Sequence, residues 1–548
     1  MDTRSTARRP ALSVVTIVVL TLPAIAAAQH LTPLPQRAQA AASVNAAALT
    51  HANAAASAPA ASPWAPLTNQ PTFIVNGYGA ANPILLTDGS VLVQDGGAQD
   101  WWKLTPDQYG SYLNGTWTAI ASLPADYSPL YHSSAVLPDG RLIIEGGEYN
   151  FFNPAWTAQG AIYDPLADSW TEIAPPPFFG GINDPPKLVI PQTIGDAQGV
   201  VLANGTFMQA DCCTTQAALL NARTLTWTPT GAGKFDENDE EGWNLLANGT
   251  VLAVDAYVGS YNPAGTNSEI YNPITGSWRS AGSTIVQLWD SAADCGGKSA
   301  ASFELGPAVL RPDGTVFYTG ANSCGAGNTA IFNSYTRTWT PGPVFPNGLD
   351  IADGPAALEP NGRVLMMASP GIYNTPSTFL EWDGRQLTIV PGTPNAPNDS
   401  SFYGNMLVLP TGQILLTDFS DDVEIYTPTP PPRGLEEVEE PVVAFAPGVV
   451  SPGNSYLVFG FGFNGVSQGA AYGDDAQGAT NYPLVRITNL QTGHVFYART
   501  HDHSFMGVAS PLPVWTHFDV SAAQEPGSSK LEVVANGVAS DPVSVVVQ

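Results

Sequence analysis

The stretch ILLTDGSVLVQDGG, at residues 84–97, decides the fold because two apolar runs flank the turn Asp88-Gly89. Asp-Gly and Asn-Gly pairs between apolar runs predict tight β-hairpins, since both turn residues can take a positive φ. The same arrangement returns at residues 135–147, as AVLPDGRLIIEGG, and five more times further along the chain. The turn glycines of the seven copies are Gly89, Gly140, Gly205, Gly249, Gly314, Gly362 and Gly412.

The spacing of these glycines indicates a repeat architecture. Neighbouring turn glycines lie 44 to 65 residues apart, which is the length of one kelch-type propeller blade. Most copies are followed by two further strand-like stretches, one of which carries a tryptophan that would fill the gap between blades. These tryptophans are Trp117, Trp170, Trp227, Trp278 and Trp339. We therefore predict an all-β chain with a seven-bladed kelch-type β-propeller at residues 63–428.

The chain after the seventh repeat predicts a second domain. Residues 429–440 are rich in Pro and Glu, which is typical of a linker. Residues 441–548 contain short apolar stretches with period-two alternation, such as SYLVFGFGF and KLEVVANG, separated by Gly, Asn and Ser. This pattern predicts an immunoglobulin-like β-sandwich.

The first residues predict where the protein goes. Arg4, Arg8 and Arg9 precede an apolar run that ends in three alanines at residue 28, the pattern of a cleavable signal peptide at residues 1–28. A membrane anchor is disfavoured because Pro23 interrupts a run that is short for a stable span. Residues 29–62 are rich in Ala and predict a linker. We expect a secreted or periplasmic protein.

The net charge restricts the partners. The chain has 47 acidic and 19 basic residues, which gives a formal charge of −28 at neutral pH. Such a surface repels phosphate backbones and anionic lipids, so binding to nucleic acid or to a membrane is disfavoured. We expect a monomer whose partner is a carbohydrate or another small extracellular ligand.

The whole arrangement resembles the galactose oxidase and glyoxal oxidase family, which are copper-radical enzymes with a kelch propeller and a C-terminal early-set immunoglobulin-like domain. The resemblance covers nearly the whole chain after residue 63. It implies copper on the propeller axis, held by a Cys-linked Tyr, a second Tyr and two His. Tyr131, nine residues before Gly140, matches the cross-linked Tyr. His501 and His503, in HVFYARTHDHSFM, match the C-terminal hairpin that enters the propeller.

Three positions depart from the family pattern. Ala80 stands where the family has the Cys of the cross-link. Phe402 and Tyr403 stand where it has the second Tyr and its adjacent His, and a shift by one residue puts Gly404 in place of the His. Divalent copper prefers imidazole and tyrosinate donors, which this set supplies poorly. We predict that the scaffold is kept and the copper-radical chemistry is lost.

Three functions remain open. The first is a ligand-binding propeller without copper-radical chemistry. The second is an alcohol or aldehyde oxidase with a rearranged copper set, in which Tyr131, Tyr403 and His501 are catalytic and His503 completes the ligands. The third is a metal-assisted hydrolase or lyase that uses carboxylates on the propeller axis.

Carboxylates occur at corresponding positions of several repeats and could gather at one mouth of the propeller. They are Asp196, Glu240, Glu241, Glu304 and Asp353. Gathered carboxylates raise one another's pKa or hold a cation, and oxygen donors suit Ca²⁺, whereas histidines would admit Zn²⁺ or Mn²⁺. The predicted metal ligands are His501, His503, Asp196, Glu240 and Asp353. The alternative is that these groups bind backbone amides where the strands begin.

Four cysteines in an exported chain suggest disulfides. Cys295 and Cys324 flank one hairpin of the fifth repeat, so a bridge between them would join its loops. Cys212 and Cys213 are adjacent and could bridge each other, but three pairings are possible from the sequence.

Overall fold

The structure is a computed structural model that describes residues 62–72, 76–184, 188–257, 267–290, 302–430 and 438–548. The predicted signal peptide, nearly all of the Ala-rich linker, and Cys295 lie outside these ranges. In the described ranges the regular structure consists of β-strands and the short 3₁₀ turns Pro346–Gly348 and Ser401–Tyr403, which confirms the all-β class. None of the described helical segments has the length and apolar character needed to cross a membrane.

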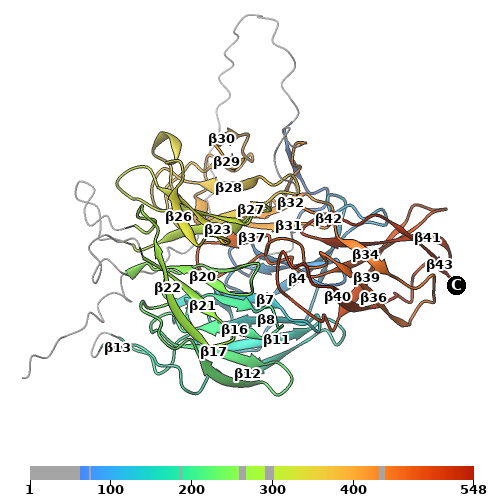
Figure 1. Ribbon diagram of the computed structural model, residues 1–548, viewed down its shortest axis with the longest axis horizontal. Helices are drawn as coiled ribbons and strands as arrows, with labels where there is room; N and C mark the ends of the chain where they lie inside the picture. The colour runs from blue at the N-terminus through green and yellow to red at the C-terminus, as the bar shows by residue number, and fades with distance from the viewer. Residues whose placement is uncertain (1–61, 73–75, 185–187, 258–266, 291–301, 431–437) are drawn as a thin grey trace, which may run out of the picture.

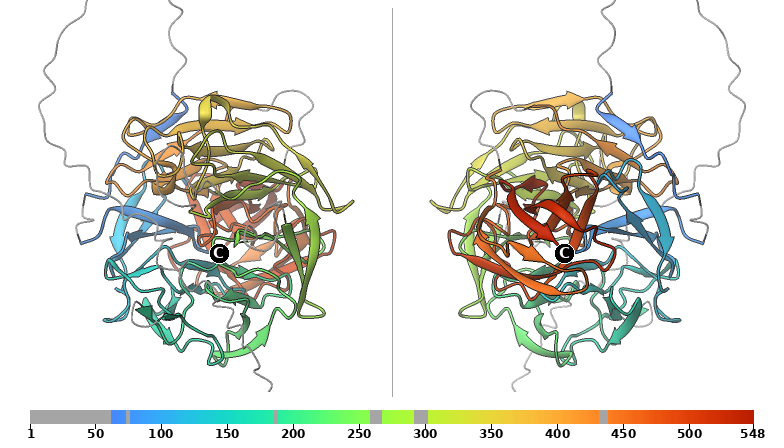
Figure 2. Two further views of the ribbon diagram at one scale, coloured as in Figure 1. Left: turned by 90° about the vertical axis from the view of Figure 1, so that its left-hand side faces the viewer. Right: turned by 90° about the vertical axis from the view of Figure 1, so that its right-hand side faces the viewer.

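The chain from β1 to β33 forms seven antiparallel sheets around a common centre, the predicted blades (Figures 1 and 2). The first strands of neighbouring blades contact one another, so they lie innermost. The first three blades are β2 (Ala80–Leu85), β3 (Val91–Asp95), β4 (Trp101–Thr105) and β5 (Thr116–Ala119); β7 (Ser133–Val136), β8 (Leu142–Glu145), β11 (Gly160–Asp164) and β12 (Ser169–Ile173); and β15 (Gly199–Val201), β16 (Phe207–Ala210), β17 (Ala217–Asn221) and β18 (Thr226–Thr230).

The next three blades repeat this order. They are β19 (Trp243–Leu245), β20 (Val251–Val254), β21 (Asn267–Asn272) and β22 (Ser277–Ser283); β23 (Leu305–Leu310), β24 (Thr315–Gly320), β25 (Thr329–Asn333) and β26 (Thr338–Pro341); and β27 (Pro355–Leu358), β28 (Val364–Ala368), β29 (Thr378–Trp382) and β30 (Leu387–Val390). Short pairs in the loops are β6 (Pro129–Leu130), β9 (Tyr149–Asn150) and β10 (Asn153–Pro154), and β13 (Asn183–Asp184) with β14 (Leu188–Val189).

The seventh blade closes the ring by combining both ends of the propeller. It contains β31 (Asn405–Val408), β32 (Ile414–Thr417) and β33 (Glu424–Tyr426), and its outer strand is β1 (Trp64–Pro66) from the start of the described chain. All seven turn glycines between first and second strands have a positive φ, from 76° to 84°. The prediction that turn chemistry sets the repeat is therefore confirmed.

The repeated tryptophans lie on the outermost strands and join neighbouring blades. The indole N–H of Trp170 donates to the carbonyl of Ala121, just past the end of the first blade, at 2.9 Å. Trp227 makes the same 2.9 Å bond to Ala174, just past the end of the second blade. These contacts confirm the structural role expected of the tryptophans.

The C-terminal strands form two halves that share β39. One half contains β34 (Val442–Phe445), β36 (Ser455–Phe461), β40 (Val514–Asp519) and β39 (Val495–His501). The other continues through β38 (Leu484–Asn489), β41 (Gly527–Ala535), β43 (Val543–Val547) and β35 (Val449–Val450), with β42 (Val538–Ala539) beside β41. Val458 and Phe518 of one half share a core with Val485 and Leu531 of the other, as in a sandwich. The immunoglobulin-like class of this C-terminal sandwich and the boundaries between the domains stay predictions.

The C-terminal domain covers the centre of the propeller face that carries the hairpin turns, as the right-hand view of Figure 2 shows. Arg499 Nη2 donates to the carbonyl of Asp139, in the turn of the second blade, at 2.7 Å. The backbone N–H of His503 donates to the carbonyl of Pro138 in the same turn at 3.0 Å.

One segment of the C-terminal domain enters the ring of blades. We call residues 468–478 the axial segment; it contains β37 (Ala470–Tyr472), which pairs antiparallel with β27 and gives the sixth blade a fifth, innermost strand. Gln477 Nε2 donates to the carbonyl of Trp243 in the fourth blade at 2.8 Å. The axial segment therefore joins two blades and carries residues from the C-terminal domain into the propeller centre.

Candidate metal centre

The loops that lead into the innermost strands bring carboxylates to one place. Asp196, Glu240, Glu304 and Asp353 each stand one to three residues before the first strand of the third, fourth, fifth and sixth blades. Glu240 and Asp353 have φ values of 57° and 48°, in the left-handed region that non-glycine residues rarely adopt. Such backbone conformations persist only where the surrounding structure imposes them, and they cluster at functional sites.

The axial segment reaches the same place from the C-terminal domain. Its residues Asp474 and Asp475 are buried, and Gln198 Nε2 donates to the Asp475 carbonyl at 3.2 Å. The approach is close enough to require glycine at position 473, because an added Cβ would lie 2.6 Å from Asp353 Oδ1. Asp474 and Asp475 therefore add two more carboxyl groups to the centre.

Five carboxylates in this centre have the spacing of a metal site. Oxygen atoms of Asp196, Asp239 and Glu240 lie within 4.8 Å of one another, and so do those of Glu240, Glu304 and Asp353. Glu240 belongs to both groups, so the two sets form one continuous cluster, which we call the axial carboxylates. Each of these five residues is at most 6% exposed to solvent.

Several oxygens of this cluster lack a partner. Among the described residues, Asp196 Oδ1, Glu240 Oε1, Glu304 Oε2 and Asp353 Oδ1 are buried without a hydrogen bond. Buried polar atoms in proteins are almost always paired, and an unpaired carboxylate oxygen is costly. Four such atoms in one cluster fit a positively charged ligand that accepts lone pairs from all of them.

The carboxyl groups of this cluster have raised pKa values. Burial, with a contribution from the charge of Asp474, raises the pKa of Asp196 to about 8. Burial raises the pKa of Glu304 to about 8. Burial, followed by the charge of Glu304, raises the pKa of Glu240 and of Asp353 well above the usual range. A bound cation would favour the ionised forms, so protons and a cation would compete for this site.

The donor set selects the kind of ion. All five axial carboxylates offer oxygen, and Ca²⁺ takes six to eight oxygen ligands in flexible geometry. Mg²⁺ also takes oxygen but demands a near-octahedral shell and retains waters, which a nearly buried cluster supplies less readily. Ca²⁺ therefore matches the arrangement best.

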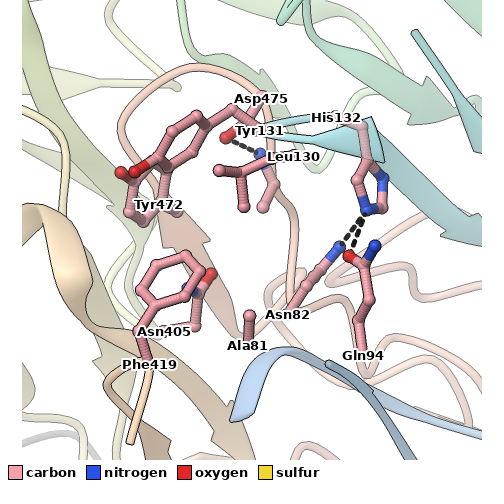
Figure 3. Close-up of a pocket in the computed structure, with 11 residues that line it drawn as sticks. Ala81, Asn82, Gln94, Leu130, Tyr131, His132, Asn405, Phe419, Tyr472 and Asp475 are labelled. Carbon is pink, nitrogen blue, oxygen red and sulfur yellow. Dashed lines mark hydrogen bonds between the residues drawn. The ribbon is translucent and has the colours of Figure 1, made fainter. Parts of the chain in front are cut away.

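A layer of aromatic rings lies beside the carboxylates, as Figure 3 shows for part of it. Tyr131 stacks on Tyr472 with ring centroids 6.5 Å apart, and Phe419 lies 6.2 Å from Tyr131 and 6.3 Å from Tyr403. The hydroxyl of Tyr373 donates to Glu304, which links the rings to the cluster. The aromatic layer therefore brings together Tyr131 and Tyr403, two of the three predicted catalytic residues.

A small cavity lies between these rings (Figure 3). Its lining includes Tyr131, Phe419, Tyr472 and Asp475, and its volume is about 20 Å³. A cavity of this size holds about one water molecule. The cavity is therefore too small to hold a sugar.

His132 turns away from Tyr131 and cannot join it in binding a metal. Its Nε2 lies 3.0 Å from Gln94 Oε1 and 3.4 Å from Asn82 Nδ2. Burial lowers the pKa of His132 to about 4, so the ring is neutral at physiological pH. His132 is thus part of the packing of the first two blades.

The residues do not fit the copper centre that the family resemblance implies. Ala80 and Phe402 are buried in place and offer no donor side chain. Position 404 has no room for a histidine, because a Cβ added to Gly404 would lie 2.6 Å from Met367 Sδ and 3.0 Å from Pro355 Cγ. Of the predicted set, Tyr131 and Tyr403 alone lie in the aromatic layer. The imidazole that lines the adjacent cavity, His132, is held by Gln94 at 3.0 Å.

The structure places His501 and His503 away from the axis, contrary to the expectation for their hairpin. His501 lies on the C-terminal domain, with its ring nitrogens 2.8 Å from Asp502 Oδ2 and 3.1 Å from Asp519 Oδ1. His503 is buried in that domain, with Nδ1 2.8 Å from Thr516 Oγ1, and burial lowers its pKa to about 3. The axial segment, not this hairpin, enters the propeller.

One predicted axial carboxylate points elsewhere. Glu241 lies 2.8 Å from Lys234 Nζ in a separate buried cluster with Glu269 and Asp255. Of the predicted metal ligands, the structure thus brings together Asp196, Glu240 and Asp353, with Glu304 between them. Sequence reasoning missed Asp239, Asp474 and Asp475; the Asp-Asp pair between glycines in AYGDDAQG was the available signal.

The cysteines in the described ranges, Cys212, Cys213 and Cys324, are disulfide-bonded. Cys212 and Cys213 form a disulfide between neighbours, which is one of the pairings left open by the sequence. Cys324 is also disulfide-bonded, and Cys295 lies outside the described residues. A Cβ added to Gly195 would lie 2.7 Å from Cys212 Sγ, so the bonded pair packs directly beneath the loop that carries Asp196.

Comparisons with known proteins agree with the fold. A kelch-like protein of Aspergillus terreus, Kelch-like protein terF, is 30% identical over 142 residues, which are 26% of this chain and 30% of that protein. The chain thus matches less than a third of that relative. No family model matches the chain. The blades and their turn glycines confirm the predicted propeller repeat, and this likeness agrees with its kelch type.

Solved structures match the chain at low sequence identity and with TM-scores below 0.5. A copper complex of a fungal alcohol oxidase of the AA5 family is 13% identical, with a TM-score of 0.45 over 89% of this chain and 98% of that one. A streptogramin B lyase is 10% identical, with a TM-score of 0.43 over 66% of this chain and 96% of that one. Propellers host unrelated functions, so the function must come from the site.

Proposed function

We propose that this chain is an exported binding protein whose propeller holds a Ca²⁺ ion on its axis, and that it is not a copper-radical oxidase. The observation that carries the proposal is the set of four buried carboxylate oxygens, on Asp196, Glu240, Glu304 and Asp353, that have no hydrogen-bond partner among the described residues. The ion would neutralise the axial carboxylates and fix the loops in front of four blades.

The ligand that we propose is a carbohydrate or a similar polyhydroxylated molecule at the outer edge of the aromatic layer. Tyr78, Tyr373 and Tyr403 pack on that layer and are partly exposed. Tyrosine rings offer a flat apolar face with a hydroxyl at the rim, which suits the mixed surface of a sugar. The hydroxyl of Tyr373 reaches Glu304, so the order of the mouth would depend on the cation.

The test is a titration of Ca²⁺ into metal-free, full-length exported protein, in which calorimetry measures the binding. We expect one strong site, and a Glu240→Gln variant that loses at least about tenfold in affinity, because Glu240 belongs to both halves of the cluster. Glu145→Gln is the matched control: Glu145 is buried in the second blade, outside the cluster, and both its oxygens lack partners.

Two results would contradict the proposal. One is Ca²⁺ binding that is absent, or equal in the wild type and Glu240→Gln, in proteins with the same melting temperature. The other is stoichiometric copper with alcohol-dependent peroxide production, which would return the oxidase hypothesis. Cleavage of a glycan that requires Ca²⁺ would support the cation site and replace simple binding by the hydrolase or lyase hypothesis.

A further inference from the structure

Two histidines face each other on neighbouring strands of the C-terminal domain. His501, the last residue of β39, is the cross-strand partner of His517 in β40. Their ring centroids lie 5.5 Å apart and the rings are 21° from parallel. Directly opposed residues in an antiparallel pair lie on the same face of the sheet, so both imidazoles share one surface.

A carboxylate completes this group. Asp502 Oδ2 lies 2.8 Å from His501 Nδ1 and 4.0 Å from His517 Nδ1. One ligand atom from each of the three residues lies within 4.8 Å of the others. His517 Nδ1 itself is covered, although its side chain is 41% exposed, and it has no hydrogen bond within the described part of the chain.

A second carboxylate orients the first histidine. Asp519 Oδ1 lies 3.1 Å from His501 Nε2, on the side of the ring that faces away from Asp502. Asp519 is in turn held by Arg499 Nη1 at 3.3 Å. A carboxylate that binds the far nitrogen of an imidazole fixes its orientation and is the usual outer partner of a metal-bound histidine.

We propose that His501, His517 and Asp502 form a second metal site, which takes a transition-metal ion, with Zn²⁺ the best match, and which Asp519 supports. Two imidazoles and one carboxylate are a common zinc donor set and leave a fourth position for water. The site shares no residue with the axial carboxylates and its donors differ, so it does not depend on the proposed calcium function.

The position of the site gives it a structural consequence. The ion would join the end of β39 to the middle of β40. It would lie next to the residues of β39 and its following turn that bond the second blade. Arg499 donates to Asp139 and His503 donates to Pro138 in that blade. Zn²⁺ would thus stabilise the part of the C-terminal domain that contacts the propeller.

The test is binding of Zn²⁺ alone to full-length protein without a polyhistidine tag, measured by competition with a colorimetric zinc chelator. Asp519→Asn should weaken binding by roughly 10- to 100-fold, as expected for an outer partner, and His517→Ala should weaken it further. His494→Ala is the matched control, because this histidine of the same domain is engaged by Glu525 at 2.7 Å, outside the group. Its affinity should equal that of the wild type.

Because His517 lies at the surface, the variant should keep the wild-type melting temperature without metal, which separates lost binding from lost folding. Wild-type affinity in His517→Ala, or equal losses in His517→Ala and His494→Ala, would overturn the proposal. Loss of Zn²⁺ binding in Glu240→Gln, rather than in His517→Ala, would also overturn the proposed second metal site, because Zn²⁺ would then bind the axial carboxylates. Unchanged Zn²⁺ affinity in Glu240→Gln is the expected result, whether or not Ca²⁺ binds there.

Discussion

Glu240 and Glu241 are adjacent in the sequence, but their side chains belong to two different buried acidic clusters. Glu241 points to Lys234, whose Nζ lies 2.8 Å from Glu241, 2.7 Å from Glu269 and 3.7 Å from Asp255. Its neighbour Glu240 points to the axial carboxylates, for which the described residues show no Lys or Arg ion pair. One cluster therefore contains a cation from the chain, whereas the other has none among the described residues.

The Lys234 cluster shows how this fold stabilises buried carboxylates. Burial alone would lower the Lys234 pKa, but the charges of Glu241, Asp255 and Glu269 raise it above the usual range. The ammonium also lies 5.5 Å from the centre of the Trp278 ring. A buried charge needs such partners to be tolerated. In the described part of the chain no equivalent cation reaches the axial carboxylates, which is why we propose an external ion there.

Removal of the internal cation should have the largest effect. Lys234→Met removes the ammonium that Glu241, Glu269 and Asp255 share, and we expect a loss of about 3–5 kcal/mol in the free energy of unfolding. Urea denaturation would measure it. The control is Lys530→Met, which breaks the partly exposed pair with Glu532 at 3.3 Å and should cost less than about 1 kcal/mol. Equal losses in both variants would remove the contrast between the clusters.

Neutralising one glutamate in each cluster should give effects of opposite kind. Glu241→Gln takes a charged partner from Lys234 and should destabilise the protein by about 1–3 kcal/mol. Glu304→Gln removes a carboxylate that lacks a cation, so the metal-free protein should be as stable as the wild type or more stable. The two free energies of unfolding, measured in a chelator, decide this. A large destabilisation by Glu304→Gln in the chelator would show that its charge is already compensated.

The pH dependence should separate the metal-free and calcium-bound proteins. Burial raises the pKa of Asp196 from 3.8, and of Glu304 from 4.5, to about 8, so the folded state binds more protons than the unfolded state in this range. Stability without metal should therefore fall as pH rises from about 4 to about 8. Ca²⁺ should raise the melting temperature most at the upper end. The same slope with and without Ca²⁺ would argue against binding at these residues.

The smallest expected effect concerns copper. Ala80→Cys combined with Phe402→Tyr restores two family donors, yet we expect no gain in bound copper, since Tyr403 then stands at the position of the missing imidazole. Copper content by mass spectrometry, after incubation of wild type and variant, checks this. Stoichiometric copper in the variant alone would mean that the centre needs only those two changes.

The repeat was predictable because its signal is local. Each hairpin depends on a glycine whose positive φ is required by the turn itself, as at Gly89 and Gly412. The spacing from those turns also located Asp196, Glu240 and Asp353 near the axis. These positions follow from chain geometry within one blade.

The errors arose where the chain departs from regular geometry. The hairpin with His501 and His503 was expected to enter the propeller, but β39 ends at His501 and Asp502 has a φ of 52°, and His503 is buried in the C-terminal domain. Glu240 also has a positive φ, and its side chain points to the axial carboxylates whereas that of Glu241 points to Lys234. The entry of Asp474 and Asp475 depends on pairing between β37 and β27, residues far apart in sequence.

The most direct test of the account is a crystal of the metal-free protein soaked in Tb³⁺, which replaces Ca²⁺ at oxygen sites and is located by its anomalous scattering. We predict a strong peak among Glu240, Glu304, Asp353, Asp196 and Asp239, and none in the Lys234 cluster. No peak at the axial carboxylates, with the five side chains ordered around an empty centre, would contradict the account.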